Sequence, residues 1–242
     1  MRRLLACAAA LLLLPACSPG PHMVVVFAAS SLNGSFTQLG AEFEASHPGV
    51  RVMFSFDGSA TLVDQLAQGA PADVFAAADR DTMERASSAG TMTPMPARFA
   101  SNELTLIVPV GNPSGITGLD ASLEGTKLVV CADGVPCGSA TAKLANHLGV
   151  TLHPVSEETK VTDVRAKVET GQADAGIVYR TDAMASPSKL TAIPIAGAGQ
   201  AANEYLIGLT SHAHAPGPAT EFITLVTGSR GQDVLRAAGF GR

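Results

Sequence analysis

The 242-residue chain lacks several features that mark redox, metal-binding and nucleic-acid-binding proteins. Its formal net charge is −5, which argues against a nucleic-acid partner. Its four cysteines include no C-x-x-C pair of the kind that redox sites use, and no metal-ligating partners are visible near them. After residue 17 no apolar run is long enough to cross a bilayer. What remains is a chain whose size allows a substantial core, in one domain or two.

The first residues predict export. Two arginines precede an apolar run that ends in Leu14-Pro15-Ala16-Cys17, a pattern typical of a secretory signal peptide. The last four residues are similar to a lipobox, the signal for attaching lipid to a cysteine, and ordinary cleavage nearby is the alternative. We expect residues 1–16 to be a signal peptide, Cys17 to be the lipidation site and residues 17–23 to form a tether. The protein would then be anchored to the membrane and face the periplasm or the cell exterior.

Two cysteines remain once the signal peptide and the lipid site are set aside. Cys131 and Cys137 are six positions apart, in a chain that is predicted to enter an oxidising compartment. Disulfides form and persist in such compartments. A Cys131–Cys137 disulfide is therefore expected.

Short apolar runs alternate with amphipathic helical patterns along the chain. Several runs lack a clean polar–apolar alternation, as strands covered on both faces do. This order predicts an α/β fold with mostly parallel sheets. The predicted strands are 24–29, 50–56, 73–78, 104–108, 128–131, 175–179 and 205–210, and the predicted helices are 32–45, 61–68, 82–89, 140–148 and 164–170.

Four helix starts are rich in small and hydroxyl residues. They contain Ser30-Ser31, Ser59, Cys137-Gly138-Ser139 and Val161-Thr162-Asp163-Val164. A helix start offers unpaired backbone N–H groups and the positive end of the helix dipole, although one serine there can simply cap its helix. The first three segments contain no lysine or arginine, and Arg165 directly follows the fourth. Four such starts favour a site that holds a small, fully deprotonated anion with neutral donors.

An ordered set of motifs resembles a known family. FAASSL, FDGSATL, GAPADVFAAAD, VPCGSA, VTDVRAKV and AGIVY are similar to motifs of the periplasmic molybdate-binding proteins of ABC importers. The resemblance covers nearly the whole chain after the tether. It implies an α/β, two-lobed periplasmic-binding-protein fold of type II, each lobe a mostly parallel sheet flanked by helices. It also implies a monomer that binds molybdate and tungstate without a cofactor and delivers them to a membrane permease.

Carried over position by position, the resemblance implies five oxyanion-binding residues. Ser31 and Ser59 would donate their hydroxyl protons from one lobe. The other lobe would supply the backbone N–H groups of Cys137 and Val164 and the hydroxyl of Tyr179. In this family the ligand lies in the cleft between the lobes.

The order of these residues predicts the division of the chain. The serine-bearing helix starts lie early and the other donors lie in the middle, and enclosing one anion requires the two groups to face each other. We therefore expect one lobe to contain residues 24–101 and 203–242 and the other to contain residues 102–202. The last segment should cover a sheet rather than touch the ligand.

Asp57 departs from the family pattern, which usually has a small neutral residue two positions before Ser59. A carboxylate that faced the ligand would repel a dianion, so we expect Asp57 to have a turn or capping role. Hydrogen phosphate carries a proton and would want an acceptor, a role open to Asp57. Sulfate, like molybdate, presents only acceptors.

Two alternative functions stay open on the sequence. The same fold could bind sulfate or phosphate, because the sequence does not give the size of the cleft. A serine hydrolase that used Ser31 or Ser59 would need a base within hydrogen-bond reach. No histidine lies near either serine in the sequence, so we expect a binding protein rather than an enzyme.

Overall fold

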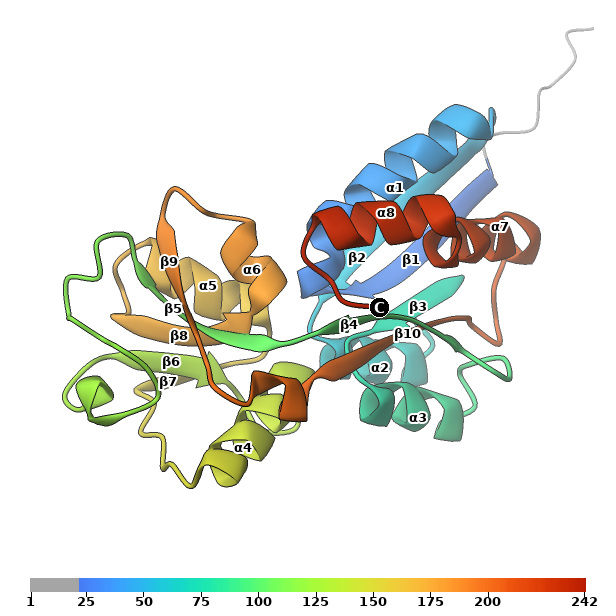
Figure 1. Ribbon diagram of the computed structural model, residues 1–242. Coiled ribbons are helices and arrows are strands. Elements are labelled where there is room, and N and C mark those ends of the chain that lie inside the picture. The colour runs from blue at the N-terminus through green and yellow to red at the C-terminus, as the bar shows by residue number, and fades with distance from the viewer. Residues whose placement is uncertain (1–21) are drawn as a thin grey trace, which may run out of the picture.

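The computed structural model describes residues 22–242, which form two five-stranded sheets flanked by helices (Figure 1). The predicted signal peptide, the lipidation site Cys17 and all but the end of the predicted tether lie outside the described residues. Within residues 22–242, none of the helices combines the length and the apolar character needed to cross a membrane.

The first sheet has the strand order β2-β1-β3-β10-β4. Its interior strand β1 alternates between two covered faces, because successive side chains of a strand point to opposite sides. Val24 and Val26 pack under α1, α7 and α8, whereas Phe27 packs with α2 and α3. The elements are β1 (His22–Ala29), η1 (Ser30–Leu32), α1 (Asn33–Ser46), β2 (Val50–Asp57), α2 (Ser59–Ala67), β3 (Val74–Ala77), α3 (Arg80–Ser88), β4 (Ala97–Asn102), β10 (Asn203–Leu209), α7 (Pro216–Thr227) and α8 (Ser229–Ala237).

The second sheet has the order β7-β6-β8-β5-β9 and its own core. Gly176 in β8 lets helix α5 pack closely, because a Cβ there would lie 2.9 Å from Val164 and 3.0 Å from Val168. The elements are β5 (Leu104–Pro109), η2 (Ala121–Leu123), β6 (Leu128–Cys131), α4 (Pro136–Leu148), β7 (Ser156–Glu158), α5 (Val161–Glu169), β8 (Ala175–Tyr179), α6 (Arg180–Met184), β9 (Leu190–Pro194) and η3 (Ala198–Ala201).

Both sheets are mixed, whereas mostly parallel sheets were predicted. β1 pairs in parallel with β2 and β3, and β6 pairs in parallel with β7 and β8. β10 and β5 are antiparallel to both of their neighbours. These two strands begin where the chain passes from one sheet to the other, and β4 and β5 are separated by Glu103 alone. Because β5 and β10 each enter their sheet from the other sheet, no crossover helix within the sheet precedes them, and parallel pairing is not imposed on them.

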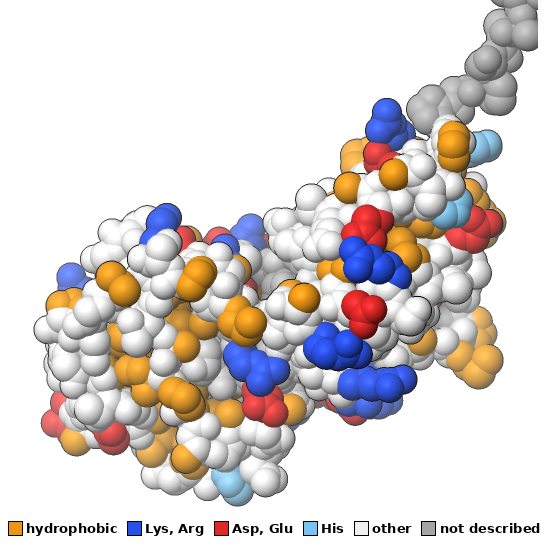
Figure 2. Space-filling view, turned by 45° about the horizontal axis from the view of Figure 1, so that its top comes forward, with side chains coloured by type: hydrophobic (Ala, Val, Ile, Leu, Met, Phe, Trp, Pro, Cys, Tyr) orange, Lys and Arg blue, Asp and Glu red, His pale blue; other side chains and the backbone are white. Residues whose placement is uncertain are grey.

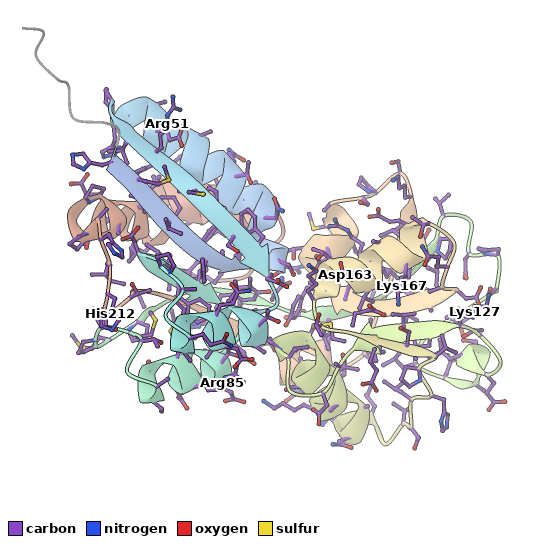
Figure 3. The ribbon with its side chains drawn as sticks, turned by 180° about the vertical axis from the view of Figure 1, so that it is seen from behind. Arg51, Arg85, Lys127, Asp163, Lys167 and His212 are labelled. Atoms are coloured by element: carbon purple, nitrogen blue, oxygen red, sulfur yellow. A yellow bond between two sulfur atoms is a disulfide. The ribbon has the colours of Figure 1, made fainter. Side chains whose placement is uncertain are left out.

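The path of the chain brings four helix starts to the boundary between the sheets. η1, α2, α4 and α5 follow β1, β2, β6 and β7 directly, and ligands of open α/β sheets bind outside the carboxyl ends of such strands. Figure 3 shows the start of α5, marked by Asp163, on the side that faces the first sheet. The final helices α7 and α8 cover the first sheet, as predicted, through Phe222, Val226 and Val234.

The charged surface is mixed in sign. Figure 2 shows lysine and arginine side chains beside aspartate and glutamate on the face in view, without a continuous basic area. Arg230 contacts Glu42 at 2.5 Å, and Arg80 contacts Glu204 at 2.7 Å. This face offers no basic footprint of the kind that nucleic acid requires.

Candidate anion site between the two sheets

A small cavity lies where the four helix starts converge. Its free volume is about 20 Å³, which suits a ligand of a few atoms rather than an organic cofactor. Each of the four helix starts contributes to its lining. Among the lining residues are Ser30, Ser31, Ser59, Cys137, Val161 and Tyr179.

The cavity contains four of the five residues implied by the family resemblance. Ser31, Ser59, Cys137 and Tyr179 line it, but Val164 does not. Val164 is fully buried in the core of the second sheet. Helix α5 begins at Val161, almost one turn before the predicted start. Both valines are buried, but Val161 stands at the helix start that lines the cavity, whereas Val164 faces the sheet.

The hydroxyl groups of Ser59 and Tyr179 are set to donate. Ser59 Oγ accepts the backbone N–H of Ala78 at 3.0 Å, and the Tyr179 hydroxyl accepts from Asn203 Nδ2 at 2.7 Å. A hydroxyl that accepts in this way keeps one proton for another partner. Burial raises the pKa of Tyr179 well above its usual value, so this hydroxyl stays protonated. Two directed protons are thus available at the cavity.

Ser31 has a buried tyrosine as its partner. Its Oγ lies 2.8 Å from the hydroxyl of Tyr205, on β10. Burial raises the pKa of Tyr205, which keeps that hydroxyl protonated as well. When Tyr205 donates to Ser31, the Ser31 proton is free for a ligand. Sequence reasoning missed Tyr205, since it lies 174 positions from Ser31.

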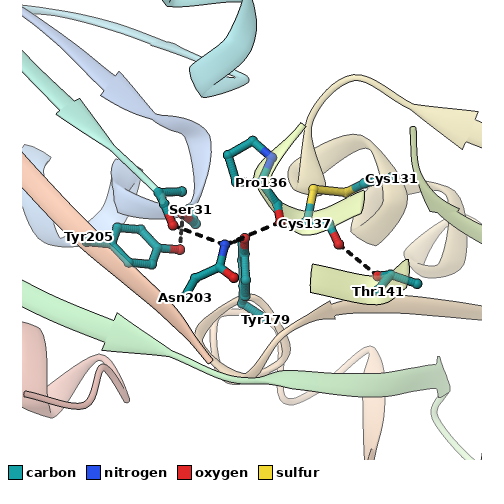
Figure 4. Close-up of a disulfide and its surroundings, with 9 residues drawn as sticks. Ser31, Cys131, Pro136, Cys137, Thr141, Tyr179, Asn203 and Tyr205 are labelled. Carbon is teal, nitrogen blue, oxygen red and sulfur yellow. Dashed lines mark hydrogen bonds between the residues drawn. A yellow bond between two sulfur atoms is a disulfide. The ribbon is translucent and has the colours of Figure 1, made fainter. Parts of the chain in front are cut away.

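Asn203 connects the two sheets beside the cavity (Figure 4). The two protons of its Nδ2 are shared among three acceptors: the carbonyl oxygens of Ala78 at 3.1 Å and Pro136 at 3.3 Å, and the Tyr179 hydroxyl at 2.7 Å. The amide thus ties β10 of the first sheet to α4 and β8 of the second. The sequence carried no signal for it, because an asparagine before a predicted strand is typical of a turn.

Cys137 and Cys131 form a disulfide in the structure, with 5.7 Å between their Cα atoms. The bond joins the end of β6 to the start of α4 (Figure 4). The intervening turn is tight, since a Cβ on Gly138 would lie 1.8 Å from the carbonyl oxygen of Ala132. The first N–H groups of a helix have no partner within it. The disulfide therefore fixes a helix start that presents N–H groups at the cavity.

One ion pair borders the cavity. Asp57 has the predicted local role, because its Oδ1 accepts the N–H of Gly58 at 2.8 Å. The same atom lies 3.6 Å from Lys160 Nζ, and both residues line the cavity. Lys160 immediately precedes Val161, the first residue of α5, and was not predicted from the sequence. The charge of Asp57 is therefore partly balanced from the other sheet.

Arg165, the cation that directly follows the fourth helix start in the sequence, lies elsewhere. It contacts Glu169 at 3.0 Å and Asp182 at 3.9 Å, beside a larger hollow of about 590 Å³. Burial raises the pKa of Asp182 to about 7, although Arg165 acts to lower it. Arg165 is thus engaged by carboxylates, and the small cavity is lined mainly by neutral donors.

A family model described as "Bacterial extracellular solute-binding protein" matches residues 24–241. The chain belongs to this family. Over 234 residues it is 43% identical to the molybdate-binding protein ModA of Mycobacterium tuberculosis (strain H37Rv). The aligned part makes up 94% of this chain and 90% of that protein.

Solved structures of solute-binding proteins share the two-lobed fold. The periplasmic molybdate-binding protein of Azotobacter vinelandii superposes with a TM-score of 0.78 at 21% identity, over 90% of this chain and 99% of that chain. The sulfate-binding protein SubI of M. tuberculosis H37Rv gives a TM-score of 0.74 at 21% identity, over 90% and 86%. These two proteins bind different oxyanions, so the fold alone does not identify the ion.

Proposed function

We propose that this solute-binding protein captures molybdate, and tungstate, outside the cytoplasm and delivers it to the permease of an ABC importer. The observation that carries the proposal is a small cavity lined by hydroxyl protons and helix starts. Kinship at 43% identity with a protein named for molybdate binding supports the choice of ion. No cofactor is needed for this function.

The donor set that we propose differs at one position from the set implied by the resemblance. It comprises the hydroxyls of Ser31, Ser59 and Tyr179 and the backbone N–H groups of Cys137 and Val161, with Val161 in place of Val164. Hydrogen bonds to an ionised partner are stronger than neutral ones. A molybdate dianion has acceptors on every side, so each of these donors would find a partner.

We further propose how the parts of the chain act. The lobes would be residues 24–101 with 203–242 and residues 102–202, closing on the anion between them. The protein would work as a monomer held to the membrane through lipid on Cys17, and the Cys131–Cys137 disulfide would form after export. The hydrolase alternative gains no support, because Ser31 and Ser59 bond to Tyr205 and Ala78 rather than to a general base.

Isothermal titration of the unlipidated mature chain tests the proposal. Molybdate, tungstate, sulfate and phosphate are each titrated at the same pH and ionic strength. We expect tight binding of molybdate and tungstate and much weaker binding of the other two. If the chain bound sulfate or phosphate more tightly, that ion and not molybdate would be its ligand. If it bound none of the four anions, the proposed function would be refuted.

Replacement of Asp57 by asparagine should leave molybdate affinity unchanged or slightly higher. The amide oxygen can still accept the Gly58 N–H, while a charge that repels a dianion is removed. Hydrogen phosphate would instead lose an acceptor for its proton. Titration of the variant with molybdate and with phosphate distinguishes the two ligands. If the parent bound phosphate tightly and the variant lost much of that affinity, the phosphate alternative would be favoured.

Replacement of Lys160 by glutamine should weaken molybdate binding by about two- to fivefold, the range of a partly exposed ion pair. The change removes the cation that balances Asp57 beside the anion. The Asp57→Asn/Lys160→Gln double variant should recover the lost affinity. A double variant that bound more weakly than Lys160→Gln alone would contradict this electrostatic role.

A further inference from the structure

Gly58 lies where a turn of the first sheet touches a loop of the second. It is buried, precedes the first residue of α2 and lines the anion cavity. A Cβ on this residue would lie 2.2 Å from the backbone carbonyl oxygen of Thr159, between β7 and α5. The next nearest atom outside Thr159 is Thr61 Oγ1, at 3.7 Å. The crowding therefore comes from across the cleft.

The backbone conformation of Gly58 does not require glycine. Its φ of −59° and ψ of 133° lie in a region that every L-residue adopts. Alanine would fit this position within the first sheet and its helices. Only the approach of Thr159 excludes a side chain.

The same two segments also carry the Asp57–Lys160 ion pair, at 3.6 Å. We call Asp57, Gly58, Thr159 and Lys160 the closure seam. All four line the anion cavity. Ser59 and Val161 follow directly on either side of the seam, so its width sets the distance between their N–H groups.

We propose that Gly58 is a positioning residue for anion capture, whose missing side chain lets the two lobes meet closely enough to share one ion. The inference rests on the proposed function, since it concerns how the two donor groups reach the same anion. When the lobes are apart, the methyl group of an alanine at this position would meet no atom of the other lobe. It would oppose only the closed form, and a ligand that binds the closed form would lose affinity accordingly.

The test compares the unlipidated mature chain with its Gly58→Ala variant. Gly217→Ala is the matched control, because Gly217 is exposed in the first turn of α7 and a Cβ there would meet nothing within 4 Å. Three quantities are measured for each protein: the melting temperature without ligand, the molybdate affinity, and the radius of gyration by X-ray scattering with and without molybdate.

We expect Gly58→Ala to keep the melting temperature of the parent and to bind molybdate at least tenfold more weakly. Its radius of gyration should fall less than that of the parent when molybdate is added at saturation. Gly217→Ala should match the parent in affinity and in contraction, and its melting temperature should not fall, because alanine favours a helix more than glycine does.

The outcomes separate this inference from the proposed function. If the Gly58→Ala variant bound molybdate and contracted like the parent, the positioning role of Gly58 would be refuted and the proposed function would be unaffected. A lower melting temperature without ligand would refute the positioning role too, since glycine would then serve the fold of one lobe. A parent chain that bound no oxyanion would refute the function and the inference together.

Discussion

Alanine at Ser59 should weaken molybdate binding by about 1.5–3 kcal/mol, the range for a hydrogen bond to a charged partner. The same change should lower the stability of the ligand-free fold. Ser59 Oγ accepts the N–H of Ala78, and a buried N–H that loses its partner costs about 1–3 kcal/mol. Titration with molybdate and urea unfolding measure the two effects separately.

Ser31→Ala is the matched comparison. It should show a similar loss of molybdate affinity with a smaller loss of stability, because the contact that it removes joins two hydroxyl groups and leaves no backbone N–H without a partner. Tyr179→Phe should cost as much binding energy or somewhat less, since the ring still fills its place. If Ser31→Ala and Ser59→Ala both bound molybdate like the parent, the site would be misassigned.

Loss of the Cys131–Cys137 disulfide should lower oxyanion affinity while the fold persists. Closing so short a loop contributes about 2 kcal/mol to stability by the loop-entropy estimate. The effect on binding has a different origin. The disulfide holds the start of α4, and with it the Cys137 N–H, in place before the ligand arrives, and such preorganisation favours binding.

The comparison uses the parent and its Cys131→Ser/Cys137→Ser variant, each with and without a thiol reductant, in chains that lack Cys17. Reductant should weaken molybdate binding by the parent several-fold and leave the variant unchanged. Equal affinity in all four samples would contradict the preorganising role. Two reactive thiols in the folded parent under non-reducing conditions would show that the bond does not form.

The strands with a clear apolar signal were predictable. β6 and β8 have the bounds that the sequence predicts, because each is a fully buried apolar run. β7 consists of Ser156-Glu157-Glu158 and was missed. Its residues have no strand pattern of their own, and they are held in place by pairing with β6. Local pattern therefore finds the strands that have an apolar run and misses an edge strand such as β7 that has none.

The site was predictable only where its residues lie in recognisable motifs. Ser31, Ser59, Cys137 and Tyr179 stand at the ends of predicted elements, and all four line the candidate cavity. Val161 was not among the predicted residues, because the sequence placed the start of this helix at residue 164 rather than 161. Asn203, Tyr205 and Lys160 act through partners from distant segments. Hydrogen bonds that orient a hydroxyl are tertiary contacts, and the sequence alone does not reveal them.

We propose that neutral donors from both lobes enclose a molybdate ion in the small cavity. A crystal structure of the chain grown with molybdate, with an anomalous difference map collected near the molybdenum edge, tests this most directly. We predict one strong peak in the cavity, within hydrogen-bond reach of the hydroxyls of Ser59 and Tyr179 and the N–H of Val161. A map with no peak there, or with its strongest peak in the larger hollow beside Arg165, would contradict the claim.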